Sequence, residues 1–179
     1  PNNHYLSSLA VIQLANLLSL NNQKDAAIKT LLDYLETKTS FKVKMTLGDH
    51  YRYQSDWVKA QAIYSQIIEN EKYALDPNMW NTFYRRGIAY ERNKQMDLAE
   101  KDFVEALKLN NNQPDVLNYL GYSWIDSDKN MLKAKNMIEL ALEQKPDDAP
   151  EDEIKKAKEQ IADEENENTE KGTNGSSNQ

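Results

Sequence analysis

The sequence repeats itself about every 34 residues, which restricts the chain to a small set of architectures. Four times in the sequence, a small residue is followed three positions later by a large one. An alanine lies 12 or 13 positions after each of these small residues. The four pairs are Ala15 with Ala27, Gly48 with Ala60, Gly87 with Ala99, and Gly121 with Ala134. The small residues are separated by 33, 39 and 34 positions and the alanines by 33, 39 and 35. The small residues and the alanines therefore indicate the same period. Repeats of this length stack on one another, because a single repeat cannot bury its apolar face alone.

Each repeat has the pattern of two helices joined by a turn. A large apolar residue follows each alanine by four positions and another apolar residue follows by seven, so these residues share one helix face. Polar residues lie between the small residue and the alanine, as in Asn21-Asn22-Gln23 and Asn93-Lys94-Gln95. We expect Gly or Ala where the two helices of a hairpin cross, and large residues in the space that these small residues leave. The large residues are Leu31, Tyr64, Phe103 and Ile138.

This pattern resembles the tetratricopeptide repeat, which reads Leu-Gly-x-x-Tyr, then Ala, then an aromatic residue, then Ala-Leu, then Pro. Residues 114–147 match best, and residues 80–113 and 41–79 follow, while residues 8–40 are degenerate. The last repeat carries Leu120, Gly121, Trp124, Ala134, Ile138, Ala141, Leu142 and Pro146. The resemblance implies an all-α fold, a right-handed α-solenoid of about four helical hairpins over residues 1–148. We expect a charged capping helix over 149–165 and a disordered tail over 166–179.

The step from Gly48 to Gly87 is about five residues longer than the repeat. The excess falls near residues 71–77, so either the preceding helix runs on or a longer loop precedes Pro77. Pro77 and Pro114 both suit the first turn of a helix, where the missing N–H costs nothing.

Charge and composition argue against several classes of function. Residues 1–146 carry 18 basic and 18 acidic side chains, so the net charge of −7 belongs entirely to residues 147–179. A neutral body argues against nucleic acid, because phosphate contacts need a clustered basic surface. No cysteine is present, which excludes disulfides and cysteine metal sites. The most apolar stretch, residues 5–20, is too short to span a bilayer, so we expect no membrane insertion.

The resemblance implies that the first helix of each hairpin lines a concave face. Tyr, Arg and Asn are frequent at its outward positions, and such residues favour interfaces. We therefore predict a site for a protein or peptide segment, against the alternative of a solvated inner face with hairpin packing. The partner-binding residues are Asp49, Arg52, Tyr53, Asn81, Tyr84, Arg85, Arg92, Asn118, Tyr119 and Tyr122. Thr46, Ile88, Asp115 and Ile125 complete the outward set, and the Lys/Asn/Arg carboxylate clamp of some family members is absent in phase.

Two features outside this face suggest further contacts. The acidic tail opposes the charge of Arg52, Arg85 and Arg92, so it either folds back and competes with a ligand or stays solvated. The first helix is apolar on more than one face, which predicts an upstream repeat, a dimer or a partner contact. The chain opens with Pro1, as expected for a fragment or a processed product.

The sequence favours binding over catalysis, and we predict no catalytic residue, metal or cofactor. His4 and His50 are far apart in sequence, and no second ligand lies at metal spacing. The alternatives to a scaffold or adaptor are a structural segment of a longer array and a regulatory domain of an enzyme whose catalytic part is absent. Residues 117–126 resemble repeats of bacterial envelope proteins, including lipoprotein adaptors, which suggests the periplasm over the cytoplasm.

Overall fold

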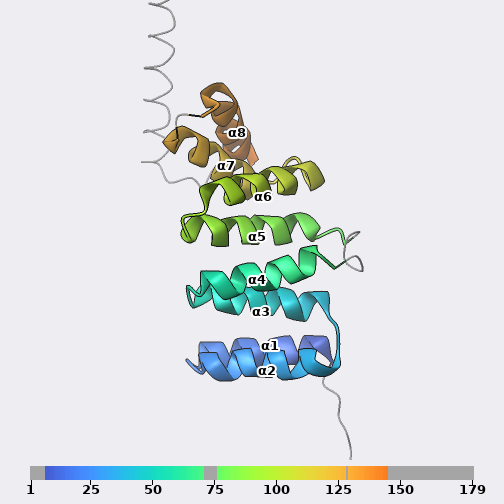
Figure 1. Ribbon diagram of the computed structural model, residues 1–179. Coiled ribbons are helices and arrows are strands. Elements are labelled where there is room, and N and C mark those ends of the chain that lie inside the picture. The colour runs from blue at the N-terminus through green and yellow to red at the C-terminus, as the bar shows by residue number, and fades with distance from the viewer. Residues whose placement is uncertain (1–6, 71–75, 128, 145–179) are drawn as a thin grey trace, which may run out of the picture. The chain divides into compact units, whose positions relative to one another are not determined.

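The computed structural model describes residues 7–70, 76–127 and 129–144 and is helical throughout its regular structure. Eight helices follow one another in this part of the chain (Figure 1). They are α1 (Ser8–Leu20), α2 (Lys24–Thr37), α3 (Phe41–Tyr53), α4 (Trp57–Ile68), α5 (Met79–Arg92), α6 (Met96–Leu109), α7 (Pro114–Asp126) and α8 (Met131–Gln144). The predicted capping helix and tail lie outside the described residues. The helices form two compact units, residues 1–109 with α1–α6 and residues 110–179 with α7 and α8.

The helices pair as consecutive hairpins, as the repeat predicts. In the first unit α1 packs on α2, α3 on α4 and α5 on α6, while α2 also packs on α3 and α4 on α5. In the second unit α7 packs on α8. The fold is therefore an all-α solenoid of helical hairpins, and the hairpins of the first unit follow one another in chain order (Figure 1).

The turns inside the hairpins share one geometry. In the first three turns the carbonyl of the large residue after the small one accepts a hydrogen bond from the backbone N–H five residues on: Leu18 from Gln23, Tyr51 from Asp56, and Tyr90 from Gln95. The residue before each of these donors has a positive φ, 62° at Asn22, 59° at Ser55 and 62° at Lys94. Such left-handed residues end helices by satisfying carbonyls that the helix leaves open.

The helix crossings confirm why small residues are needed. A Cβ atom added to Gly48 would lie 2.5 Å from Cε1 of Tyr64, and one added to Gly87 would lie 2.6 Å from Cε1 of Phe103. At Gly121 the nearest atom would be Cγ1 of Ile138 at 2.7 Å. The large residue of each second helix thus occupies the space that the glycine of the first helix leaves.

Two apolar clusters contribute to the core of the first unit. One joins α1, α2 and α3, and the other joins α3, α4 and α5. Tyr51 and Ile63 pack against both, so each hairpin completes the core of its neighbour. The buried members are Val11, Ala15, Ala27, Leu31, Val43 and Leu47 in the first cluster and Met45, Ala60, Tyr64, Ile67, Met79 and Ala89 in the second.

The connection between α4 and α5 settles two expectations. Helix α4 ends at Ile68 and α5 begins at Met79, so the extra residues lie between the helices and do not lengthen α4. The first-turn position predicted for Pro77 is wrong, because α5 begins two residues later and Asn78 is its N-cap. The Asp76 carboxylate accepts a 2.8 Å hydrogen bond from the Asn78 N–H, which forms a turn before the helix. Pro114 does begin its helix, as predicted.

Among the described residues, no helix has the length and apolar character needed to cross a membrane.

Candidate functional site

The outward residues of α3 and α5 form the candidate site within the first unit. Helix α3 supplies three of the predicted residues and α5 supplies four, whereas the other three lie on α7 in the second unit. All ten keep some exposure to solvent. Two apolar positions expected to point outward do not, since Ile88 is 7% exposed and Ile125 is 3% exposed. An isoleucine at the margin of the face gains more from burial than from contact with water.

Asp49 of α3 is the centre of a polar cluster that we define as Asp49, Arg52, Tyr64, Asn81 and Arg85. The Tyr64 hydroxyl on α4 donates a 2.9 Å hydrogen bond to Oδ1 of Asp49. Arg85 of α5 donates through Nη1 to Oδ2 of the same carboxylate and forms an ion pair with it. One carboxylate therefore ties together three helices of two successive hairpins.

Arg85 is held from a second side as well. Its Nε donates a 2.6 Å hydrogen bond to Oδ1 of Asn81, one turn earlier on α5. A guanidinium has five N–H donors, and these contacts use those on Nε and Nη1. The side chain is 27% exposed, so it is fixed in position yet reachable from solvent.

Arg52 joins the cluster from the end of α3. Its Nε lies 3.5 Å from Oδ1 of Asp49, and its side chain is 21% exposed. Its guanidinium carbon lies 4.7 Å from the ring centroid of Tyr53, which is a cation–π arrangement. Tyr53 is 71% exposed, so an exposed aromatic ring lies beside Arg52.

The electrostatics keep Tyr64 a hydrogen-bond donor. Burial, followed by the charge and hydrogen bond of Asp49, raises the pKa of the Tyr64 phenol well above its usual range. The hydroxyl therefore remains protonated at neutral pH and donates to the carboxylate. With two guanidinium groups and one carboxylate, the cluster has a net charge of +1.

Other predicted residues do not join this cluster. Arg92 pairs with Glu91, with 3.4 Å between Nε and Oε2, and its side chain is 54% exposed. The ring centroid of Tyr84 lies 6.2 Å from that of Phe103, a hairpin packing contact. Asn118, Tyr119 and Tyr122 belong to the second unit, where they keep partial exposure on α7.

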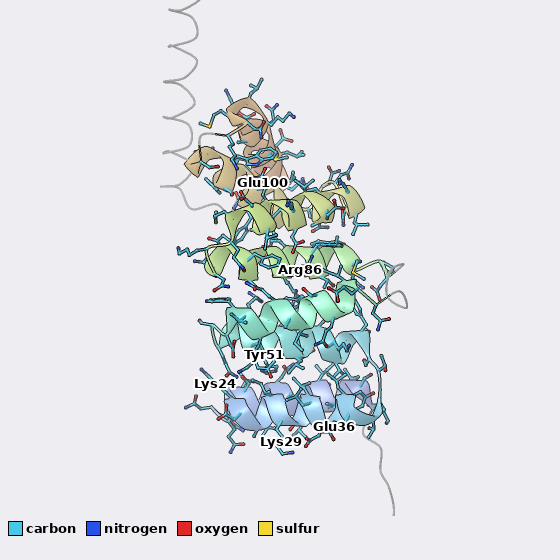
Figure 2. All side chains as sticks on the ribbon, in the orientation of Figure 1. Lys24, Lys29, Glu36, Tyr51, Arg86 and Glu100 are labelled. Carbon is cyan, nitrogen blue, oxygen red and sulfur yellow. The ribbon has the colours of Figure 1, made fainter. Side chains whose placement is uncertain are left out.

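A buried ion pair on α5 was not predicted from the sequence. Arg86 is labelled on α5 in Figure 2. It donates from Nε and Nη2 to the two oxygens of Asp102 on α6, at 2.7 and 2.8 Å, and from Nη1 to Oγ of Ser65 on α4 at 2.9 Å. The rings of Phe83 and Tyr90 flank its guanidinium, with centroids at 5.7 and 5.5 Å. Burial raises the pKa of the Asp102 carboxyl although Arg86 opposes that shift. The pair fastens α4, α5 and α6 together.

A sequence signal for this pair did exist. Arg86 lies directly before the crossing residue Gly87, and Asp102 lies between Ala99 and Ala106 on the buried phase of α6. Charged residues of opposite sign at buried positions of paired helices must meet or leave a charge unpaired.

His50 is buried at the contact between the first two hairpins. It is 5% exposed, and its Nε2 lies 3.3 Å from Oδ1 of Asn16 on α1. Burial lowers the pKa of His50, while Asp49 acts in the opposite direction. In the part of the chain that the structure describes, no group of three or more His, Asp or Glu residues could hold a metal ion.

Comparisons with known proteins agree with this architecture. No protein-family model matches the sequence. Over 104 residues, or 57% of the chain, it is 32% identical to the general transcriptional corepressor trfA of Dictyostelium discoideum. That match spans only 7% of the relative, so it concerns a short part of a much longer protein.

Solved structures resemble the chain over most of its length. The structure from the functional characterization of Pseudomonas aeruginosa PilF has a TM-score of 0.70 at 19% identity, with 76% of this chain and 60% of that one covered. MamA from Desulfovibrio magneticus RS-1, from residue 41 onward, has a TM-score of 0.64 at 14% identity, with 80% and 78% covered. Both are tetratricopeptide-type proteins. The repeat pattern, the helix crossings and these similarities together show that this chain has the fold of tetratricopeptide-type proteins.

Proposed function

We propose that the chain is a protein-interaction scaffold that binds a polypeptide segment of a partner over the outward surface of α3 and α5. The observation that carries this proposal is the polar cluster, in which Asp49 forms ion pairs with Arg52 and Arg85 and both arginines stay partly exposed. The exposed ring of Tyr53 lies beside it.

The cluster suits the recognition of a polypeptide for a physical reason. Binding normally costs free energy to immobilise long side chains, and ion pairs within the free protein have already restricted these two arginines. Arg and Tyr are also the residue types that carry the largest share of binding energy in many interfaces. The excess positive charge favours a segment that presents carboxylate or carbonyl oxygens.

The relatives support binding only at the level of the fold. The Dictyostelium protein is named a transcriptional corepressor, but the similarity covers a small part of it. The comparisons therefore support a scaffold of helical hairpins. We propose that this scaffold binds a partner and does not catalyse a reaction.

A selection from a displayed peptide library tests the proposal. Peptides enriched on the purified 179-residue chain would be titrated by fluorescence anisotropy against the wild type and the Arg85→Gln variant. We expect Arg85→Gln to weaken binding by about tenfold or more, the loss typical of a residue that anchors an interface.

Lys108→Gln is the matched control, because Lys108 lies on α6, outside the proposed surface, and forms an exposed ion pair with Glu105. It should bind peptides as the wild type does. Failure to enrich any peptide, or equal losses in the two variants, would refute the assignment to this surface.

A further inference from the structure

Helix α1 exposes an apolar surface that the other described residues of the first unit leave uncovered. Its 13 residues include no charged side chain. Leu9, Leu14, Leu17 and Leu20 are 63%, 40%, 57% and 83% exposed. At 100° per residue these four leucines fall within one arc of about 140°, so they form a single face, here called the α1 leucine face.

The repeat shows what such a face normally contacts. Leu14 precedes the crossing residue Ala15 by one position, as Leu47 precedes Gly48 and Arg86 precedes Gly87. Leu47 is fully buried in the cluster with residues of α1 and α2. Arg86 bonds to Ser65 of α4. In both later hairpins this position is covered by the hairpin before it.

Leu17 shows the same relationship. It follows its crossing residue by two positions, as His50 follows Gly48 and Ala89 follows Gly87. His50 is 5% exposed and contacts Asn16 of the preceding hairpin, and Ala89 is fully buried and accepts a hydrogen bond from Gln61. Leu14 and Leu17, the two central residues of the α1 leucine face, thus have the position and the apolar character of an inter-hairpin interface, and both remain exposed.

We propose that a second copy of this chain covers the α1 leucine face, with the two α1 helices packed antiparallel about a two-fold axis. An interface of this kind requires a self-complementary surface. A two-fold axis that pairs Leu9 with Leu20 of the copy passes between residues 14 and 15. An axis that pairs Leu14 with Leu17 of the copy lies only one residue further along, so one axis serves both pairs closely. In an antiparallel pair Leu9 therefore meets Leu20 of the copy, and the central leucines meet each other.

Electrostatics permit this self-association. Identical surfaces repel when they carry charge of one sign, and α1 carries none. The adjoining helix α2 has two lysines and three acidic residues, so its charges are mixed in sign. Burial of eight exposed leucines by a pair of copies supplies the driving force.

The first test measures the mass of the full chain by sedimentation equilibrium between about 1 and about 200 µM, the range in which interfaces of modest size dissociate. We expect the wild type to change from monomer to dimer. Leu17→Glu and Leu20→Glu should remain monomers with unchanged helical circular dichroism, since both positions are exposed. Leu132→Glu, at a leucine of α8 that is 70% exposed, is the matched control and should dimerise normally.

The second test uses the absence of cysteine from the chain. Residues 9 and 20 of one helix are about 16 Å apart. In the antiparallel pair residue 9 of the copy lies opposite residue 20, so the two copies of residue 9 are separated by this distance, which is beyond the reach of a disulfide. A mixture of Leu9→Cys and Leu20→Cys chains should give crosslinked heterodimers on oxidation, while Leu9→Cys alone should not crosslink. Efficient crosslinking of Leu9→Cys with itself would overturn the antiparallel arrangement.

A wild type that stays monomeric at all these concentrations would overturn the proposal, and so would a dimer that survives Leu17→Glu. Binding of a separate tetratricopeptide-type hairpin to the face of a monomeric chain would identify a different occupant and equally overturn it. Peptide binding by Leu17→Glu should match that of the wild type, because the polar cluster lies on α3, α4 and α5. The two proposals can therefore fail separately.

Discussion

Tyr64 of α4 places its ring against Gly48 of α3, where an added Cβ would lie 2.5 Å from the ring. Its hydroxyl reaches past this crossing to donate a 2.9 Å hydrogen bond to Asp49. One side chain thus fills the core of its hairpin and orients the carboxylate that holds Arg52 and Arg85. Stability and the candidate site depend on the same residue.

Tyr64→Phe should separate these two roles. The ring would still fill the crossing, but the Asp49 carboxylate would lose a buried donor, which costs about 1 to 2 kcal/mol of unfolding free energy. Urea denaturation measures the loss. Tyr53→Phe, at a tyrosine that is 71% exposed, should change stability by less than about 0.5 kcal/mol. Equal effects of the two substitutions would show that the hydroxyl contact with Asp49 has no energetic role.

Gly87→Ala should destabilise the third hairpin by about 1 to 2 kcal/mol. Overpacking against Phe103 costs about 1 to 3 kcal/mol, and the better helix propensity of alanine offsets part of it. In a double-mutant cycle, Phe103→Leu should reduce the cost of Gly87→Ala by about 1 kcal/mol, because it removes the ring atoms that clash. Additive effects would argue against this contact as the source.

Removal of one partner of the buried ion pair should be more damaging than removal of both. Arg86→Met leaves the Asp102 carboxylate buried without its cation, which costs about 3 to 5 kcal/mol. Arg86→Met/Asp102→Leu should recover most of this loss, as measured by chemical denaturation. Lys29→Met breaks the exposed pair with Asp33 and should leave stability unchanged. A double variant no more stable than Arg86→Met would contradict the account.

Protonation of His50 should make stability depend on pH. Its pKa in the folded chain is lowered by burial from 6.5, so the unfolded chain takes up the proton first as the pH falls. The stabilisation is therefore complete above about pH 6.5 and is lost as the pH falls through the folded value. Unfolding in urea at pH 7.5 and pH 5.5 should show a larger loss for the wild type than for His50→Gln. Equal losses would mean that another group is responsible.

Much of the hairpin architecture could be predicted from the sequence because its rules are local. Small residues at Gly48, Gly87 and Gly121 and large ones at Tyr64, Phe103 and Ile138 recur at fixed spacing, and the structure brings each pair together. The extra residues between α4 and α5 could not be placed in the same way. Their number was visible in the sequence, but only the structure showed that α4 ends at Ile68 and does not extend into them.

The candidate site was predictable only as a set of outward positions. Helical phase indicated Asp49, Arg52 and Arg85 as neighbours of the same face, but it could not show that one carboxylate holds both arginines. It also placed Ile88 outward, although the packed structure buries that side chain. The helical phase of a residue specifies the direction in which its side chain leaves the helix axis. Whether that side chain is buried depends on the neighbouring helix.

The sequence by itself determined the repeat, the pairing of helices into hairpins and the residue types at each crossing, since these follow from spacing along the chain. Tertiary structure alone decided which polar groups meet. The Arg86–Asp102 pair and the Asp49 cluster each join residues from three helices, and ion pairs form only where packing brings charges within a few ångströms. The exposure of Leu14 and Leu17 is likewise a tertiary property, because the equivalent residues of α3 and α5 are covered by the hairpin before them.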